Sequence, residues 1–310
     1  MIVLYVNGIY EKSISLSNQQ ETSKQILGSS ETYTQNFSEF TFNSAKPSHI
    51  NNYNIKFLDW FVGFVEGDGS FVINYKTNRV SFIITQKDPK VLYYIKKNLG
   101  FGKVYLCQDT YYRFIVSKFI NLQYLIQIFS GRLLLEKSTI RYITWVRSFI
   151  LYYQLNTNLK IIYKKLFINL DNGWFSGFID AEGCFDSYKR FGRLTYRMRF
   201  SIKQKKEAFF LLNLPYCWDK LQKKLKVGSV SKNKNIFIFT IDSLVKLDYL
   251  IIYLTKFPLK SNKNLSYCKW LRLYRILKDG CRGKDFDTIK KLAQNINKLE
   301  NEDKVHKFEK

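Results

Sequence analysis

Apolar and polar residues along the chain follow the same order of patterns twice. Each copy reads as an apolar helix, a pair of strands, a second helix, a second pair of strands and closing helices. Gly63 and Gly177 hold equivalent positions, so the copies are offset by 177 − 63 = 114 residues. An internal repeat of this kind predicts an α+β fold made of two pseudo-symmetric units.

The predicted elements can be placed by residue range. In the first copy they are a helix at 57–66, strands at 70–76 and 79–87, a helix at 91–99, strands at 102–107 and 112–118, and helices within 121–153. In the second copy they are a helix at 173–180, strands at 184–190 and 195–205, a helix around 209–225 interrupted near Pro215, strands at 228–232 and 236–241, and helices from 244 onward.

Composition divides the chain around the two units. Residues 1–54 are rich in Ser, Thr, Gln, Asn and Glu with little periodicity, so we expect a disordered polar extension. The first unit is predicted to span 55–153 and the second 173–280. Residues 154–172 form a linker that is apolar enough to pack on one unit, and residues 281–310 are expected to be a basic tail.

The predicted strands alternate between polar and apolar residues. Along 195–203 the odd positions are polar or basic and the even positions are apolar, as in a sheet with one buried and one solvated face. Strand 79–86 repeats the alternation, although Ile83 interrupts its polar row. A solvated face would explain either strand alone, but the recurrence in both halves favours a basic platform on each unit.

Charge and composition narrow the classes of function. The chain holds 50 Lys and Arg against 25 Asp and Glu, a net charge of +25, so a polyanion is the expected partner and a merely basic surface is the alternative. No apolar run is long enough to span a membrane, and no signal or transit peptide is recognised. Five isolated cysteines support neither a zinc site nor a disulfide framework, and they fit a reducing compartment.

Two similar stretches carry the candidate chemistry: FVGFVEGDGSF at 61–71 and FSGFIDAEGCF at 175–185. Small residues four positions apart lie on one face of a helix and allow a second helix backbone to approach closely. Because a glycine inside a helix costs about 1 kcal/mol relative to alanine, close helix contact is the expected compensation. We therefore expect the two helices to pack together through Gly63, Gly67, Gly177 and Ala181.

Paired helices would bring Asp68 and Glu182 together at their C-terminal ends. Two carboxylates at such an end repel each other unless a cation is present, and hard oxygen ligands suit Mg²⁺. Paired metals can activate a water and stabilise the leaving oxygen of a phosphodiester. The alternative is that the acidic pairs, Glu66 with Asp68 and Asp180 with Glu182, are solvated helix ends or caps.

These two motifs resemble those of the LAGLIDADG homing endonucleases, in the single-chain form with two copies. The resemblance covers roughly 59–277 and includes the strand ends TQK and KQK. It implies two αββαββα units, a helix-pair interface and a saddle of two four-stranded antiparallel sheets over the DNA major groove. It also implies a monomer that makes site-specific double-strand breaks in intron homing, with short 3′ overhangs.

The resemblance also assigns roles to individual residues. Asp68 and Glu182 match the metal-binding positions and are the expected catalytic pair, although the second motif has Glu where Asp is common. Glu66 and Asp180 match an earlier acidic position that is structural. Gln86 and Gln204 match a polar position that orders water, and Lys137 and Lys263 match a basic position that supports transition-state charge.

DNA contacts are expected from the outward rows of the strands. In the major groove Arg reads guanine and Asn reads adenine, whereas Lys in loops mainly holds phosphates. The halves differ in these residues, so the target is expected to be long and asymmetric. The expected contacts are Ser70, Asn74, Lys76, Arg79, Ser81 and Thr85 in the first unit and Asp186, Tyr188, Arg190, Arg197, Arg199, Ser201 and Lys203 in the second.

Two other functions stay open at the level of sequence. Some proteins of this fold are maturases that bind the intron RNA that encodes them, with or without DNA cleavage, and the basic C-terminal stretch would also suit RNA. A regulator without catalysis would be expected to lack the metal carboxylates. A bias toward Lys, Asn, Ile, Tyr and Phe, typical of A/T-rich organellar genes, predicts a mitochondrial or chloroplast origin.

Overall fold

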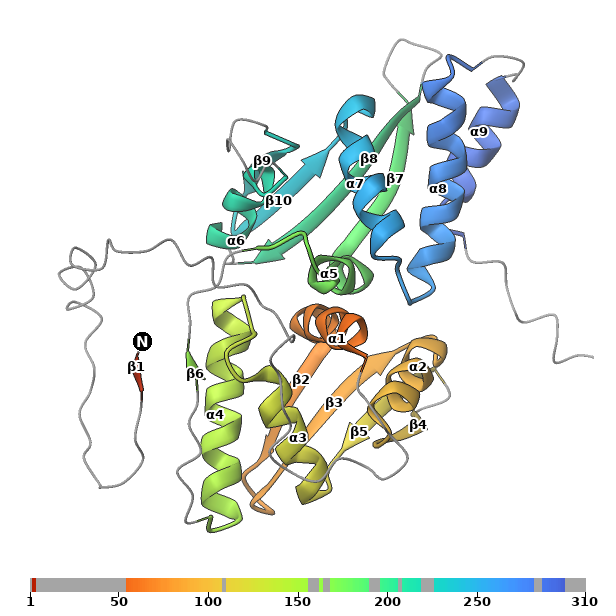
Figure 1. The fold of residues 1–310 in the computed structure, drawn as a ribbon. Helices are drawn as coiled ribbons and strands as arrows, with labels where there is room; N and C mark the ends of the chain where they lie inside the picture. Colours follow the sequence, from red (N-terminus) through yellow and green to blue (C-terminus); the bar gives the residue numbers. More distant parts are fainter. Residues whose placement is uncertain are drawn as a thin grey trace, which may run out of the picture.

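Two four-stranded antiparallel sheets lie on either side of a central pair of helices (Figure 1). The computed structural model describes residues 54–107, 110–155, 168–189, 196–205, 208–218, 226–281 and 286–298, with two short strands, β1 (Ile2–Val3) and β6 (Ile162–Tyr163). β1 pairs antiparallel with β6. The rest of the expected polar extension, up to residue 53, lies outside the described residues.

The order of elements is the same in both halves, as predicted. The first half comprises α1 (Ile55–Asp68), β2 (Gly69–Asn74), β3 (Arg79–Gln86), α2 (Lys90–Leu99), β4 (Lys103–Cys107), β5 (Tyr111–Val116), α3 (Phe119–Phe129) and α4 (Glu136–Tyr152). The second comprises α5 (Trp174–Glu182), β7 (Gly183–Lys189), β8 (Tyr196–Lys205), α6 (Ala208–Asn213), β9 (Ser229–Asn233), β10 (Ile236–Ile241), α7 (Leu244–Lys256) and α8 (Lys263–Lys278). A 3₁₀ turn at Leu214–Tyr216 follows α6, where the predicted helix meets Pro215.

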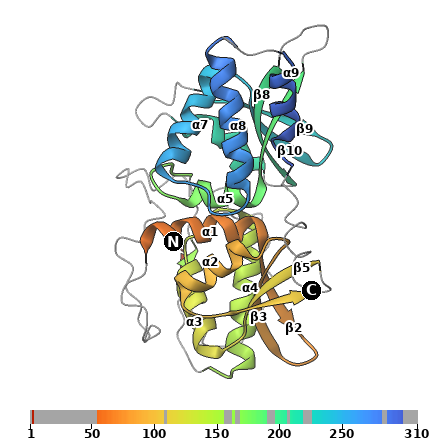
Figure 2. The ribbon, with the colours of Figure 1, turned by 90° about the vertical axis from the view of Figure 1, so that its right-hand side faces the viewer.

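The sheets share one topology. Their strand orders are β2-β3-β5-β4 and β7-β8-β10-β9. In each sheet the hairpin that follows the repeated helix, β2 with β3 or β7 with β8, lies at one edge. Helices cover one face of each sheet, and the faces they leave free lie on the same side of the molecule (Figure 2). The α+β class and the saddle of two sheets are therefore confirmed.

Strand alternation places the core between each sheet and its helices. In β3 the inward residues Val80, Phe82 and Ile84 are buried, while Arg79 and Thr85 are exposed. An aromatic cluster fills each core at matching positions. The phenylalanines at 71 and 185 are 114 residues apart, and each contacts a tryptophan of a closing helix, Trp145 in α4 or Trp270 in α8. Phe71 lies 5.4 Å from Trp145, and Phe185 lies 5.4 Å from Trp270, measured between ring centroids.

The described parts of the predicted linker and C-terminal tail pack against the folded units. Apolar residues at both ends of the predicted linker pack against the core; these are Leu155, Ile168 and Leu170. Part of the segment expected to be a tail is helical, because Phe286–Asn295 form a further helix, α9. Ile289 and Ile296 are buried, and the Asn297 amide donates to the Phe185 carbonyl oxygen at 3.0 Å. The second unit therefore extends at least to residue 298.

No helix in the described part of the chain is long and apolar enough to cross a membrane.

Candidate active site

The motif helices α1 and α5 touch through their backbones. A Cβ atom added at Gly63 would overlap the carbonyl oxygen of Trp174, and one added at Gly177 would overlap that of Trp60. A Cβ atom at Gly67 would overlap the Cβ of Ala181. All four residues of the expected helix interface thus lie in this contact, which only small side chains allow.

Glu66, the earlier acidic residue of the first motif, is a structural anchor between the halves. Its carboxylate accepts hydrogen bonds from the backbone N–H groups of Leu134 and Leu135, at 2.9 and 2.7 Å, just before α4. It also accepts one from the indole Nε1 of Trp174, across the interface, at 2.8 Å. Glu66 is 3% exposed, so its role is to join elements rather than to bind ligands.

Asp180 repeats this arrangement in the opposite direction. Its carboxylate accepts from the backbone N–H groups of Lys260 and Ser261, at 2.6 and 3.1 Å, just before α8. The indole Nε1 of Trp60, from the first half, donates to it at 2.8 Å. Burial raises the pKa of Asp180, while the hydrogen bonds from Ser261, Lys260 and Trp60 lower it. The structure therefore supports the structural role inferred for both earlier acids.

The two tryptophans were not singled out from the sequence. Each precedes its motif glycine by three residues, and they are offset by 174 − 60 = 114, like the glycines. A repeated tryptophan inside a repeated helix is the signal that could have identified them. Sequence analysis missed their role because a tryptophan in an apolar helix is usually explained by packing.

Asp68 and Glu182 are the last residues of α1 and α5, side by side at the helix pair. The Asp68 carboxylate accepts a hydrogen bond from Gln86 Nε2 at 2.6 Å. Burial raises the pKa of Asp68 to about 6; the charges of Glu182 and Asp180 raise it too, while Gln86 and the Lys263 charge lower it. A carboxyl group that is this unfavourable to ionise would gain from a bound cation.

Lys263, at the start of α8 in the second half, lies beside the carboxylates of Asp68 and Glu182. Its Nζ donates to the Ala181 carbonyl oxygen at 3.0 Å. Burial lowers its pKa, and the charges of Asp180, Asp68 and Glu182 raise it. Lys137 holds the equivalent place in α4, because 263 − 137 = 126 equals the spacing of the carboxylate-bound backbone groups, 261 − 135 = 126. The pairing of the two lysines that the resemblance implies is consistent with this spacing.

A cavity of about 370 Å³ opens at the ends of the motif helices. Asp68 and Gln86 from the first half and Gly183, Cys184 and Lys263 from the second line it, among others. The structure thus brings together three of the predicted catalytic residues around one cavity. Glu182, Gln204 and Lys137 do not line this cavity. Gln204 is only 4% exposed and lies on the inward row of β8.

The carboxylates suit a divalent metal with few protein ligands. Within the described residues no group of three or more His, Cys, Asp or Glu could hold a metal ion. Mg²⁺ commonly takes only one or two carboxylates, keeps several waters and binds substrate phosphates. Asp68 and Glu182 therefore fit such an ion when a phosphate is present, and they would not make a closed protein cage.

The residues of the first unit that were expected to contact DNA lie on the free face of its sheet or in the adjoining turn. Pairing register places Ser70, Asn74, Arg79, Ser81 and Thr85 on this face, and Lys76 is exposed in the turn between β2 and β3. The Asn74 side-chain oxygen accepts from Lys76 and Thr77 N–H in that turn, so only its amide N–H groups are available. The same register adds residues that the sequence analysis missed, namely Lys103, Tyr105 and Arg113.

The free face of the second sheet departs further from expectation. Tyr188, Arg197, Arg199 and Lys203 lie on it, together with Asp186. Ser201 lies in the same row but is only 4% exposed, because β7 at Cys184 and β10 at Thr240 flank it on both sides. We therefore no longer expect Ser201 to contact DNA. Arg190 lies outside the described residues.

Comparisons with known proteins agree with this geometry. A family model described as "LAGLIDADG endonuclease" matches residues 61–149 and 175–274. A Neurospora crassa protein named "Probable intron-encoded endonuclease 4" is 35% identical over 251 residues, which cover 77% of this chain and 44% of the relative. The chain therefore spans under half the length of that relative. A Schizosaccharomyces pombe protein named "Uncharacterized cox1 intron-2 37.2 kDa protein" is 26% identical over 260 residues, 81% of this chain and 76% of the relative.

Solved structures show the same fold. The LAGLIDADG meganuclease I-AabMI, bound to uncleaved DNA, has a TM-score of 0.64 at 18% identity and covers 77% of this chain and 99% of its own. I-SmaMI, bound to its uncleaved DNA target in the presence of calcium ions, has a TM-score of 0.60 at 15% identity, with 78% and 99% covered. At these identities the likeness establishes the two-unit saddle architecture.

Proposed function

Because the chain belongs to the LAGLIDADG endonuclease family, we propose that it is a site-specific double-strand DNA endonuclease that acts in intron homing. The observation that carries this proposal is the cavity where Asp68, Gln86 and Lys263 meet at the ends of the paired helices. The cavity lies between two sheets whose free faces are basic. A reactive centre between two DNA-binding faces suits cleavage at the middle of a long, asymmetric target.

The chain's own residues prepare this centre. Asp68 and Glu182 would hold Mg²⁺, which supplies a water of lowered pKa and neutralises charge on the phosphate oxygens. Gln86 fixes the Asp68 carboxylate through its hydrogen bond. Lys263 places a positive charge beside both carboxylates, where it can stabilise charge that develops on the phosphate in the transition state.

Cleavage of DNA with the intronless host gene tests the proposal. We expect one Mg²⁺-dependent double-strand break with the natural protein, and binding without cleavage when Ca²⁺ replaces Mg²⁺. Asp68→Asn should abolish the break, whereas Asp279→Asn, an exposed carboxylate at the end of α8, should leave it unchanged.

Other outcomes of the same experiment have clear meanings. Uncut DNA with the natural protein in Mg²⁺ would contradict the proposal. If the uncut DNA were accompanied by tight, specific binding of the intron RNA, the maturase alternative would take its place. Cleavage that survives in Asp68→Asn would remove the assigned metal role of Asp68.

We also propose a mitochondrial origin for the gene. The A/T-biased composition supports this, as does the similarity to a reading frame named after a cox1 intron. Northern analysis of RNA from purified organelles would test it.

A further inference from the structure

An acidic residue lies within a strand on the free face of the second sheet. Asp186 is the only Asp or Glu within the eight strands of the two four-stranded sheets as the structure describes them. Pairing register puts it on the free face of the second sheet, directly opposite Arg199. A lone carboxylate facing DNA is unfavourable, so its presence needs an explanation.

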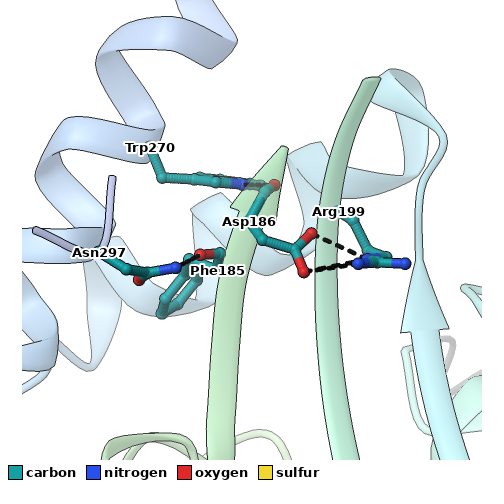
Figure 3. A network of polar contacts seen from close by, with 5 residues as sticks. All are labelled: Phe185, Asp186, Arg199, Trp270 and Asn297. Carbon is teal, nitrogen blue, oxygen red and sulfur yellow. Dashed lines mark hydrogen bonds and ion pairs between the residues drawn. The ribbon is translucent and has the colours of Figure 1, made fainter. Parts of the chain in front are cut away.

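Asp186 holds the guanidinium of Arg199 along one edge (Figure 3). Arg199 Nε donates to Asp186 Oδ1 at 2.8 Å, and Nη2 donates to Oδ2 at 2.8 Å. This side-on, bidentate pair leaves the terminal edge of the guanidinium free, with one N–H group on Nη1 and one on Nη2. The Arg199 side chain stays 42% exposed, against 24% for that of Asp186, so the arginine is the more accessible partner of the pair.

The pair is also supported by its surroundings. Arg199 Cζ lies 5.1 Å from the centre of the Tyr188 ring, which restricts the guanidinium from a second side. On the strand that carries Asp186, the Asp186 carbonyl oxygen accepts from Trp270 Nε1 at 3.1 Å, and the Phe185 carbonyl oxygen accepts from Asn297 (Figure 3). Both the carboxylate and its backbone are therefore fixed before any DNA binds.

We propose that Arg199 reads a guanine in the part of the target that the second sheet covers, and that Asp186 is the positioning residue that makes this contact specific. The inference rests on the proposed function. The free edge of Arg199 offers two parallel N–H groups, which match the O6 and N7 acceptors of guanine in the major groove. Asp186 beside it would repel a phosphate, so the base edge is the favoured partner.

Fixing the guanidinium also strengthens the contact. A long side chain normally loses rotamer freedom when it binds, and this loss weakens binding. Asp186 and Tyr188 have already restricted Arg199, so less freedom is lost at recognition. The first sheet has no such pair, because Val72 and Ser81 stand opposite each other at the equivalent register.

Selection from a randomised DNA duplex library in Ca²⁺ tests the assignment. The natural protein should enrich a long site with guanine at one position beneath the second sheet. Arg199→Lys should lower the preference for guanine there by roughly tenfold or more, since lysine cannot make a bidentate contact. Asp186→Asn should weaken the same preference by a smaller factor. The double variant should lose no more than Arg199→Lys alone, because the two residues act as a unit.

Arg197→Lys is the matched control. Arg197 lies on the same face, and its ion pair with Asp242 is long, at 3.8 Å between Nη1 and Oδ2, so its substitution should leave the guanine position of Arg199 unchanged. An equal loss of affinity at all positions with Arg199→Lys would mean a phosphate contact and would overturn the assignment. An unchanged profile with Asp186→Asn would overturn the positioning role. If the natural protein enriched no sequence at all, the proposed function itself would fail.

Discussion

The two halves of this protein are nearly identical where they face each other and different where they face solvent. At the interface, Trp60, Gly63 and Glu66 are matched at 174, 177 and 180 by Trp, Gly and Asp, and the matched residues make the same contacts in opposite directions. On the free faces, β2 presents Ser70, Val72 and Asn74 where β7 presents Cys184, Asp186 and Tyr188.

This contrast shows which residues the partner half constrains. An interface position must fit a backbone at contact distance, so few side chains are acceptable there. A position on a free face must fit only the ligand, and the two halves meet different parts of an asymmetric target. The comparison can therefore be tested at the interface, where the halves should respond alike, and on the faces, where they should not.

The largest effect is expected from filling the glycine contact. Gly63→Ala and Gly177→Ala should each lower the free energy of unfolding by about 4 kcal/mol or more, because the added methyl would meet a backbone oxygen that cannot move alone. Helix propensity predicts the opposite sign, a gain of about 1 kcal/mol. Urea unfolding measures both, with Ser176→Ala in α5 as the control. Unequal losses would show that the contact is not symmetric.

The next largest effect on stability is expected from a buried acid in the first half that has no acidic equivalent in the second. Asp59 lies in α1 where the second half has Gly173, and burial raises its pKa to about 7, while the Arg132 charge lowers it. The folded state therefore keeps a proton that the unfolded state loses, so the free energy of unfolding falls as pH rises from about 4 to 7.

Asp59→Asn should remove that pH dependence from the first half. The difference in unfolding free energy between the variant and the natural protein should be about 2 to 3 kcal/mol more in favour of the variant at pH 8 than at pH 5. Urea unfolding at the two pH values measures this difference. An identical gain at both would mean that Asp59 does not titrate in this range.

The indole bonds are expected to contribute less. Trp60→Phe and Trp174→Phe each remove one donor to a buried carboxylate and should each cost about 2 kcal/mol of unfolding free energy. Trp218→Phe is the control, because Trp218 Nε1 has no hydrogen-bond partner among the described residues. A loss at only one interface tryptophan would show that one half depends more on the bond than the other.

The smallest effect would come from copying the pair on the second face onto the first. Val72→Asp with Ser81→Arg places the two residues in the register of Asp186 and Arg199. The double variant should acquire a guanine preference of about tenfold beneath the first sheet, measured by library selection. Val72→Asp alone should weaken binding, since its carboxylate would be unpaired. Absence of any new preference would show that the backbone anchors on β7 are also required.

Much of this molecule is predictable from the chain because it repeats. The element order, the helix contact and the pair Asp68 and Glu182 all follow from two copies of one pattern. The reciprocal indole bonds were missed although their signal was repeated, because hydrogen bonding across a domain boundary is not visible in hydrophobic periodicity. The pairing of Asp186 with Arg199 depends on the register of a hairpin, which sequence alone does not fix.

Helix α9 was missed for a different reason. Phe286, Ile289, Leu292 and Ile296 recur at helical spacing, but charged residues between them give the segment the composition of a tail. Ser201 was expected to contact DNA because alternation gives the direction of a side chain. Alternation does not say how deeply neighbouring strands bury it.

The reciprocal bonds between tryptophan and carboxylate also determine how the molecule comes apart. Each buried carboxyl group completes its set of donors only when the opposite half is docked. If either half opened locally, the buried carboxylate in each half would lose its indole donor. The slowest amides of α1 and α5 should therefore exchange with solvent hydrogen at one common rate, set by global unfolding, so that the two copies of the repeat behave as a single cooperative unit.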